Sequence, residues 1–259
     1  MPGMKLSRGS NLACLIVGLL ALGPFAAPAR GAGGLYLTWN ECVLGPGASH
    51  DRADGCSSNL VTQDLYCAFQ MPASADSVLG VEIVVDVQHA DAALPDWWQF
   101  AAGGCRAGFL RADFDFTTRT ACSDFFLGFA AGGLQGYYVG QPRGADSQAR
   151  IKLAASLLPS FGYASLDATH TYYAARITLT NDDTAPPAAV CAGCADAACL
   201  VLNSILVRRQ PGAAGGDVFL QTPGPGNANF ATWQGGAGAD CAAVPARSMT
   251  WGRIKSLYR

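Results

Sequence analysis

The chain has 259 residues, 50% hydrophobic and 14% charged, with 31 Gly, 14 Pro and 10 Cys. This composition is too apolar for a disordered protein and lacks the strict glycine period of collagen. The formal charge of -2 excludes the basic surface of a protein that binds nucleic acid or an anionic membrane. Glu and Lys, both good helix formers, are rare, whereas Gly, Pro and Asp are common, so the composition favours an all-β protein.

The first residues have the three parts of a secretory signal peptide. Lys5 and Arg8 precede an apolar run over residues 12–22, and Ala27-Pro28-Ala29 supplies an A-x-A cleavage site. A membrane anchor is the alternative, but it needs about 20 apolar residues, and Gly23-Pro24 interrupts the run. We therefore predict a signal peptide at 1–29, a mature chain of 30–259, and a protein that is secreted or periplasmic with no membrane span after cleavage.

Apolar and polar residues alternate in several segments separated by turn residues, which is typical of strands with one buried face. The clearest strand is 81–88, where four aliphatic residues share one face, and 109–116 and 172–180 follow the same pattern. Weaker candidates are 35–39, 60–71, 125–129, 137–139, 150–157, 199–207 and 218–221. The best helix candidate is 145–158, although the alternation in its second half favours a strand there.

About ten strands without intervening amphipathic helices argue against βαβ units and a parallel sheet. We expect an antiparallel β-sandwich of jelly-roll or Greek-key type that forms a single domain over 30–259. Export also makes disulfides the expected state of its cysteines.

Nine cysteines remain after removal of the signal peptide, so one is unpaired. Cys67 is the candidate for a buried free thiol, because it shares a strand face with Leu65, Phe69 and Met71. The short loops between them favour the pairs Cys42 with Cys56 and Cys105 with Cys122. We expect eight cysteines in disulfides: Cys42, Cys56, Cys105, Cys122, Cys191, Cys194, Cys199 and Cys241.

The last four of these have a spacing that also resembles a metal site. Four thiolates could hold a structural zinc ion, and the C-x-x-C at Cys191 and Cys194 could be redox-active. A second C-x-x-C is missing, however, and an oxidising compartment converts neighbouring thiols into disulfides. We favour two structural disulfides here, one of which ties Cys241 back to the 191–199 segment.

Two groups of acidic residues are weak candidates for a calcium site. Asp51 and Asp54 lie in one loop, and Asp182 and Asp183 follow Asn181 after a predicted strand. Carboxylate and amide oxygens suit Ca²⁺, but neither group has a full ligand pattern, and these residue types also cap turns. We predict no other cofactor and no metal beyond this possibility.

Aromatic residues give the best hint of a binding surface. Trp97 and Trp98 are adjacent, so in a strand they would face opposite sides, and one would be exposed. Together with Tyr137, Tyr138 and Trp233 they could form a platform for a sugar ring or a protein partner. The alternative is that these residues belong to the core, where tryptophan is mostly found.

The sequence contains none of the motifs G-x-S-x-G, H-E-x-x-H, P-loop or dinucleotide fingerprint. The three histidines are widely spaced, and Asp113 and Asp115 share a strand face at a separation that would suit glycoside hydrolysis. A solvated face balanced by Arg111 is the simpler interpretation of that pair.

Several segments resemble a group of uncharacterised secreted bacterial proteins. These are the start Leu35 to Cys42, the segment Leu94 to Phe100, the run Cys191 to Asn203, the segment Ala231 to Gly236 and the end Thr250 to Arg259. The resemblance implies export from a bacterial cell and no particular activity, cofactor or catalytic residue.

Taken together, the sequence favours a non-enzymatic secreted or periplasmic binding module, with carbohydrate or an extracellular protein as its ligand. The rival interpretations are a secreted hydrolase with a site built across strands and a structural component of the envelope.

Overall fold

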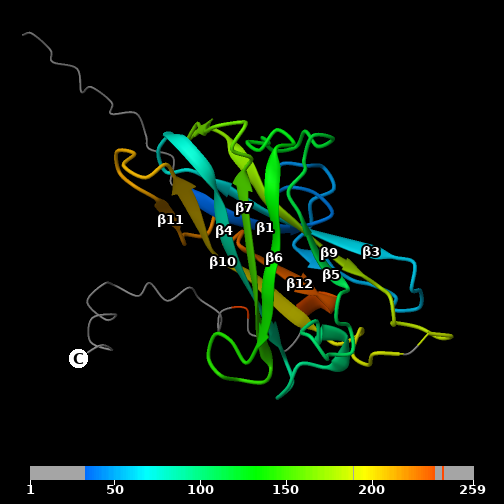
Figure 1. The fold of residues 1–259 in the computed structure, drawn as a ribbon. Coiled ribbons are helices and arrows are strands. Elements are labelled where there is room, and N and C mark those ends of the chain that lie inside the picture. Colours follow the sequence, from blue (N-terminus) through cyan, green and yellow to red (C-terminus); the bar gives the residue numbers. More distant parts are fainter. Residues whose placement is uncertain (1–32, 189, 237–240, 242–259) are drawn as a thin grey trace, which may run out of the picture.

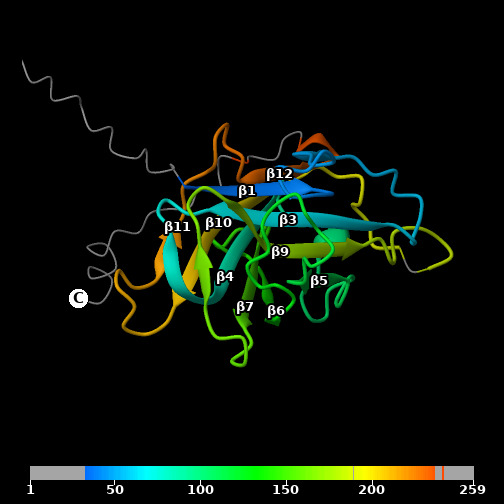
Figure 2. The ribbon, with the colours of Figure 1, turned by 90° about the horizontal axis from the view of Figure 1, so that it is seen from above.

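The computed structural model describes residues 33–188, 190–236 and 241, so the predicted signal peptide and the Thr250 to Arg259 segment lie outside the described residues. Two β-sheets pack face to face. Sheet A has the strand order β1-β3-β9-β5, and sheet B has the order β2-β12-β10-β4-β7-β6, with β11 beside β10 and β8 beside β4. In Figure 1 strands β4, β7 and β6 run in front of sheet A, and Figure 2 shows the two layers from above. The prediction of an all-β, disulfide-stapled sandwich is confirmed.

All strand pairs are antiparallel except β2 with β12. Sheet A consists of β1 (Gly34–Trp39), β3 (Thr62–Gln70), β9 (Thr171–Thr180) and β5 (Leu110–Asp113). Sheet B consists of β2 (Asp51–Arg52), β12 (Phe230–Trp233), β10 (Ala198–Arg209), β4 (Ala75–His89), β7 (Gln148–Leu157) and β6 (Ala130–Val139), with β11 (Val218–Leu220) and β8 (Ala164–Leu166). Two short 3₁₀ turns, η1 (Asp96–Trp98) and η2 (Gln234–Gly236), complete the described elements.

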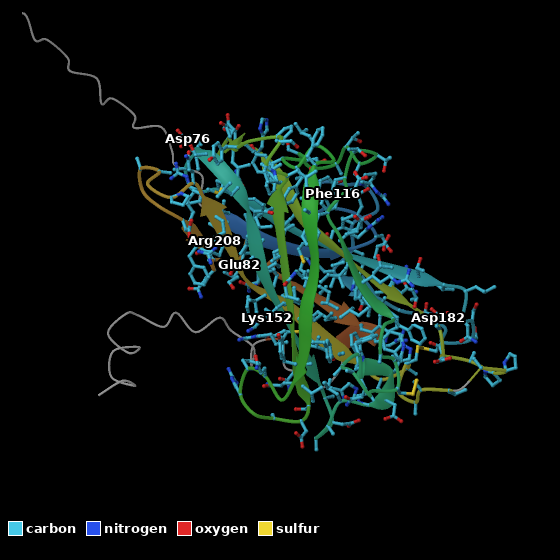
Figure 3. All side chains as sticks on the ribbon, viewed as in Figure 1. Asp76, Glu82, Phe116, Lys152, Asp182 and Arg208 are labelled. Carbon is cyan, nitrogen blue, oxygen red and sulfur yellow. A yellow bond between two sulfur atoms is a disulfide. The ribbon has the colours of Figure 1, made fainter. Side chains whose placement is uncertain are left out.

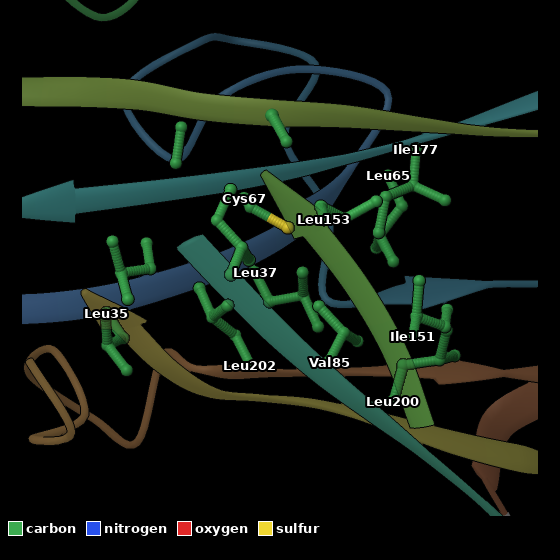
Figure 4. Packing of buried hydrophobic residues seen from close by; sticks show 14 of the residues in the cluster. Leu35, Leu37, Leu65, Cys67, Val85, Ile151, Leu153, Ile177, Leu200 and Leu202 are labelled. Atoms are coloured by element: carbon green, nitrogen blue, oxygen red, sulfur yellow. The ribbon is translucent and has the colours of Figure 1, made fainter. Parts of the chain in front are cut away.

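The main core lies between the sheets and follows the alternation of the sequence. Figure 4 shows Leu37 and Cys67 of sheet A facing Val85 and Leu202 of sheet B, and all four side chains are buried. The period of two places every second residue of β4 in this core, from Val81 to Val87. Cys67 is unpaired and lies within this apolar layer, where burial raises the pKa of its thiol.

A second, smaller core covers the outer face of sheet A. It forms around Tyr66 and Tyr173, and Phe116 stacks on Tyr173 with the ring centroids 4.5 Å apart. The sequence pattern placed Tyr173 on the same face as Ala175, but a β-bulge between Cys67 and Ala68 shifts the register there. Tyr172 therefore enters the main core and Tyr173 the outer one, because one extra residue reverses the faces of a strand.

The expected strands mostly correspond to observed ones, with clear exceptions. Residues 125–129 form turns, and β6 begins seven residues before the predicted 137–139. The second half of the candidate helix 145–158 is strand β7, as the alternation favours. β2, β8 and β12 were missed because they have only two to four residues each, too few to show a period.

Four disulfides join segments that are distant in the sequence. They pair Cys42 with Cys122, Cys56 with Cys194, Cys105 with Cys191 and Cys199 with Cys241. The predicted pairs Cys42 with Cys56 and Cys105 with Cys122 are therefore wrong, since the fold and not loop length decides which thiols meet. Of the two disulfides expected among the last four cysteines, only Cys199–Cys241 forms. Cys191 and Cys194 have partners outside this group, so the expected second bond is wrong and the zinc alternative fails.

Candidate functional site: the outer face of sheet B

Strand β6 is a long edge strand that carries no charge. Its ten residues, Ala130 to Val139, contain no Lys, Arg, Asp, Glu or Pro, and three of them are glycine. Within the described residues β6 pairs with β7 on one side and with no strand on the other. Natural edge strands are usually protected by charges, prolines or short length. β6 has none of these features, but a bulge interrupts it between Leu134 and Gly136, and the end of β5 lies beside its first residues.

A groove lies beside β6 on the outer face of sheet B, with a volume of about 480 Å³. Small residues of three adjacent strands form its floor, among them Gly80 of β4, Ala154 and Ser156 of β7 and Ala131 of β6. Gly80 is required here, because a Cβ atom would lie 2.1 Å from the carbonyl oxygen of Ala155. Small side chains on neighbouring strands therefore leave this part of the face hollow.

Charged residues line one side of the groove but are bound to one another. Arg208 of β10 donates to Glu82 of β4 through Nε at 2.7 Å and to Asp217 through Nη1 at 2.7 Å. Figure 3 shows Arg208 and Glu82 next to each other, far from Asp182. Because these charges are paired, the groove presents an approximately neutral, mainly apolar surface to a ligand.

Apolar side chains that are exposed or partly exposed lie around the start of β6. Phe129 and Phe161 stack with their ring centroids 4.8 Å apart, and Leu158 is hydrogen-bonded through its N–H to the carbonyl oxygen of Phe129. Leu127 and Tyr163 are about half exposed, at 55% and 49%. We call Leu127, Phe129, Leu158, Phe161 and Tyr163 the Phe129 patch. A contiguous exposed apolar patch is typical of an interaction site.

The aromatic platform expected from the sequence is not a surface. Trp97, Trp98 and Trp233 are at most 1% exposed and Tyr137 is buried, so the expectation of an exposed tryptophan is wrong. Trp97 and Trp98 lie in the 3₁₀ turn η1, where the alternation of a strand does not apply. Of the predicted ligand-binding residues, Tyr138 alone has a well exposed ring, which also lies 5.1 Å from the ammonium of Lys152.

Instead, the tryptophans close one end of the inter-sheet core. Trp97 stacks on Trp233 with the ring centroids 4.8 Å apart, and its indole N–H donates to Oγ1 of Thr184 at 2.9 Å. The phenolic hydroxyl of Tyr137 donates to the carbonyl oxygen of Trp98 at 2.5 Å. This packing links the 3₁₀ turn to β12 and to β6.

The outer face of sheet B also contains a buried ion pair. Arg150 of β7 donates twice to the carboxylate of Asp86 of β4, through Nε at 2.6 Å and Nη2 at 2.7 Å, and Asn203 donates to the same carboxylate. Asp86 is 0% exposed. Burial raises the pKa of Asp86, whereas the hydrogen bonds from Arg150 and Asn203 act in the opposite direction.

We expect Arg150→Ala to lower the free energy of unfolding by about 3 kcal/mol at neutral pH, because it leaves a buried carboxylate without its partner. An acid whose pKa is raised in the folded state stabilises the fold at low pH and loses that contribution as the pH rises through the raised value. The deficit should therefore shrink at acidic pH, where the carboxylate of Asp86 takes up a proton. Urea unfolding at both pH values tests this, and an equal deficit at both would contradict it.

The carboxylates considered for hydrolysis are engaged in local structure. Asp113 pairs with Arg176, and Asp115 accepts hydrogen bonds from the N–H and hydroxyl of Thr117, at 3.0 and 2.7 Å. These hydrogen bonds hold the pKa of Asp115 below its usual range, the opposite of what a general acid requires. Tyr173 donates to Glu41 at 2.8 Å, but its ring is fully buried and burial raises its pKa to about 12.

The weak calcium candidates are only partly brought together. Asp51 lies in β2 and accepts from the hydroxyl of Thr232 and the N–H of Gly235, at 2.7 and 3.0 Å. Asp54 meets the second segment through Asn181, whose amide donates to it at 3.1 Å. Asp182 and Asp183 take no part in this contact. Their negative charges act on the guanidinium of Arg106 and raise its pKa, against the effect of burial.

No protein-family model, curated protein or solved structure matches this chain. Among the described residues, no helix has the length and apolar character needed to cross a membrane.

Proposed function

We propose that this protein is a non-enzymatic binding module outside the cytoplasm, which binds an extended segment of a partner protein on the outer face of sheet B, along β6. The observation that carries the proposal is the uncharged ten-residue edge strand. An extended peptide can add to such an edge through main-chain hydrogen bonds, while side-chain pockets give specificity. The groove lies on the outer face of sheet B and includes residues of β6, and the Phe129 patch lies around the start of the same strand.

Export of the chain is consistent with its disulfides. Four disulfides are typical of an oxidising compartment, either a periplasm or the exterior. We retain the signal peptide at 1–29 and the single domain at 30–259 as parts of this proposal. A protein partner is favoured over carbohydrate because Trp97, Trp98 and Trp233 are buried, and because the Phe129 patch includes aliphatic side chains that cannot stack on a sugar.

Gly133 offers a specific test of this surface. A Cβ atom there would have no heavy atom within 4 Å, so a side chain should be accommodated without loss of the fold. We expect Gly133→Lys to weaken peptide binding at least about tenfold, because a lysine beside an edge strand opposes the addition of another strand. Gly47→Lys is the matched control, since a Cβ atom at Gly47 is equally free and Gly47 lies outside sheet B.

The ligands would be peptides selected from a displayed random library on the mature, oxidised protein. Hydrogen exchange should show that a selected peptide protects the amides of Ala130–Val139, and titrations should show weaker binding to Gly133→Lys only. Failure to enrich any peptide, or protection confined to other strands, would overturn the proposal. A glycan that binds both lysine variants equally would favour the carbohydrate alternative, and self-association through β6 would favour a structural envelope component.

A further inference from the structure

The disulfide between Cys199 and Cys241 fixes one point of the chain on the outer face of sheet B. Cys199 and Val201 alternate along β10 with residues of the inter-sheet core, so their side chains point to the opposite face. There they pack with Phe230 and Cys241 in a small separate cluster. The 242–259 segment, which lies outside the described residues, therefore starts from the face that carries the groove.

The groove lies within reach of this anchor. Cys199 pairs with Gln88 of β4, and Gly80, which lines the groove, is eight residues away along the same strand. At about 3.3 Å per residue along a strand and about 4.8 Å between strands, Gly80 lies roughly 27 Å from Cys199. Ten extended residues span about 33 Å, so the chain after the anchor can reach the groove by Trp251.

The 242–259 segment has the composition of a ligand for an apolar groove on an acidic protein. Trp251, Ile254 and Tyr258 follow the i, i+3, i+7 spacing by which one face of a helix inserts into such a groove. The segment contains four basic residues and no acidic one, whereas 33–236 contain 10 Lys and Arg against 18 Asp and Glu, a net charge of -8. The opposite charges attract the segment to the folded part of the chain.

Apolar side chains beside the groove are without cover among the described residues. Phe219 of β11 is 57% exposed and lies next to Leu206, its partner in β10. Leu206 is partly exposed and pairs in turn with Glu82 of β4, which lines the groove. The apolar surface therefore continues from the groove to β11, and an exposed apolar surface of this kind is typical of an interaction site.

We infer that the 242–259 segment docks on the outer face of sheet B of its own molecule, with Trp251, Ile254 and Tyr258 in the groove beside Gly80. The anchor at Cys241 gives the segment a high effective concentration at this face, which no separate ligand has. A docked segment covers the groove, so a partner peptide along β6 would have to displace it. The inference itself does not rest on the binding of such a peptide.

Crosslinking of two lysines tests this placement in the mature, oxidised protein. Apart from Lys5 in the predicted signal peptide, the chain contains only Lys152 and Lys255. Lys152 pairs with Val84 of β4 and lies on the outer face of sheet B (Figure 3). Lys255 lies within the segment. A short amine-reactive crosslinker, followed by peptide mass spectrometry, should give a link between Lys152 and Lys255 within one molecule.

The matched control moves one lysine without changing their number. In Lys152→Gln/Gly47→Lys the new side chain has space, because a Cβ atom at Gly47 has no heavy atom within 4 Å. Gly47 lies four residues before Asp51, which is two strands from Cys199 in the same row, so an undocked segment would reach it as readily as position 152. We expect the link from position 47 to Lys255 to form at least about fivefold less, because docking concentrates Lys255 beside the groove.

Two variants of the segment test the role of its apolar side chains. Trp251→Ser should lower the yield of the Lys152–Lys255 link to that of the control, whereas Ser256→Ala, which leaves the apolar residues in place, should retain it. Equal yields from positions 152 and 47, links formed only between two copies of the chain, or an unchanged yield in Trp251→Ser would overturn the inference. These measurements are made without a partner peptide, so they stand whether or not β6 binds one.

Discussion

Removing the disulfide between Cys56 and Cys194 is expected to lower the free energy of unfolding by about 4 kcal/mol, through the greater chain entropy of the unfolded state. The two residues are 138 apart in the sequence. The bonds Cys42–Cys122 and Cys105–Cys191 already shorten the path between them, so the loop that Cys56–Cys194 closes has only about 34 residues. Urea unfolding of Cys56→Ala/Cys194→Ala measures the loss.

The same reasoning predicts that these two disulfides are not independent. Once Cys56–Cys194 has been removed, it no longer shortens the loop that Cys105–Cys191 closes. Removing Cys105–Cys191 as the second step should therefore cost about 5 kcal/mol, whereas removing it first would cost about 4 kcal/mol. Cys67→Ala is the control for loss of a buried sulfur without loss of a crosslink, with an expected cost of about 1 kcal/mol. A loss for Cys56→Ala/Cys194→Ala no larger than that of the control would contradict the entropic account.

Arg106→Ala is expected to lower the free energy of unfolding by about 4 kcal/mol, since it removes a buried guanidinium that satisfies two main-chain groups. Arg106 is 0% exposed and donates to the carbonyl oxygens of Trp97 and Thr180. Its guanidinium carbon lies 4.0 Å from the ring centroid of Trp97 and 4.9 Å from that of Phe100. Truncation leaves two unpaired carbonyls and a cavity between the rings.

The charge state of Arg106 allows these contributions to be separated. Burial lowers the pKa of Arg106 to about 10, while Asp182 and Asp183 act in the opposite direction, so the side chain remains charged at neutral pH. Arg106→Met fills most of the volume without the charge or the hydrogen bonds, and we expect it to lose about half as much stability as Arg106→Ala. Urea unfolding compares both variants, and Arg106→Ala within 1 kcal/mol of wild type would show that water replaces the guanidinium.

Part of the candidate site could have been found in the sequence. The run from Ala130 to Val139 is free of charge and proline, an unusual property for a strand at an edge. Its position at the edge, however, follows from the order of β4, β7 and β6 in sheet B, which is a long-range property. The groove likewise depends on Gly80, Ala154 and Ala131 being neighbours across three strands.

The hydrogen bonds of Asp54 with Gln63 and Asn181 show the same limit. The sequence indicated two oxygen-rich segments, but Gln63 has no special feature in a strand pattern, and its amide meets Asp54 only because β3 begins beside the β2–β3 loop.

The sequence by itself determined the all-β class and the free thiol at Cys67. It also determined which residues of β4, of β7 and of the part of β9 after the bulge face the core. These properties depend on local composition and on the period of two along a strand. Only the tertiary structure decided which cysteines pair, that the tryptophans are buried, and which strand is left at the edge. Those properties depend on contacts between residues 40 to 140 positions apart, and no local pattern encodes such contacts.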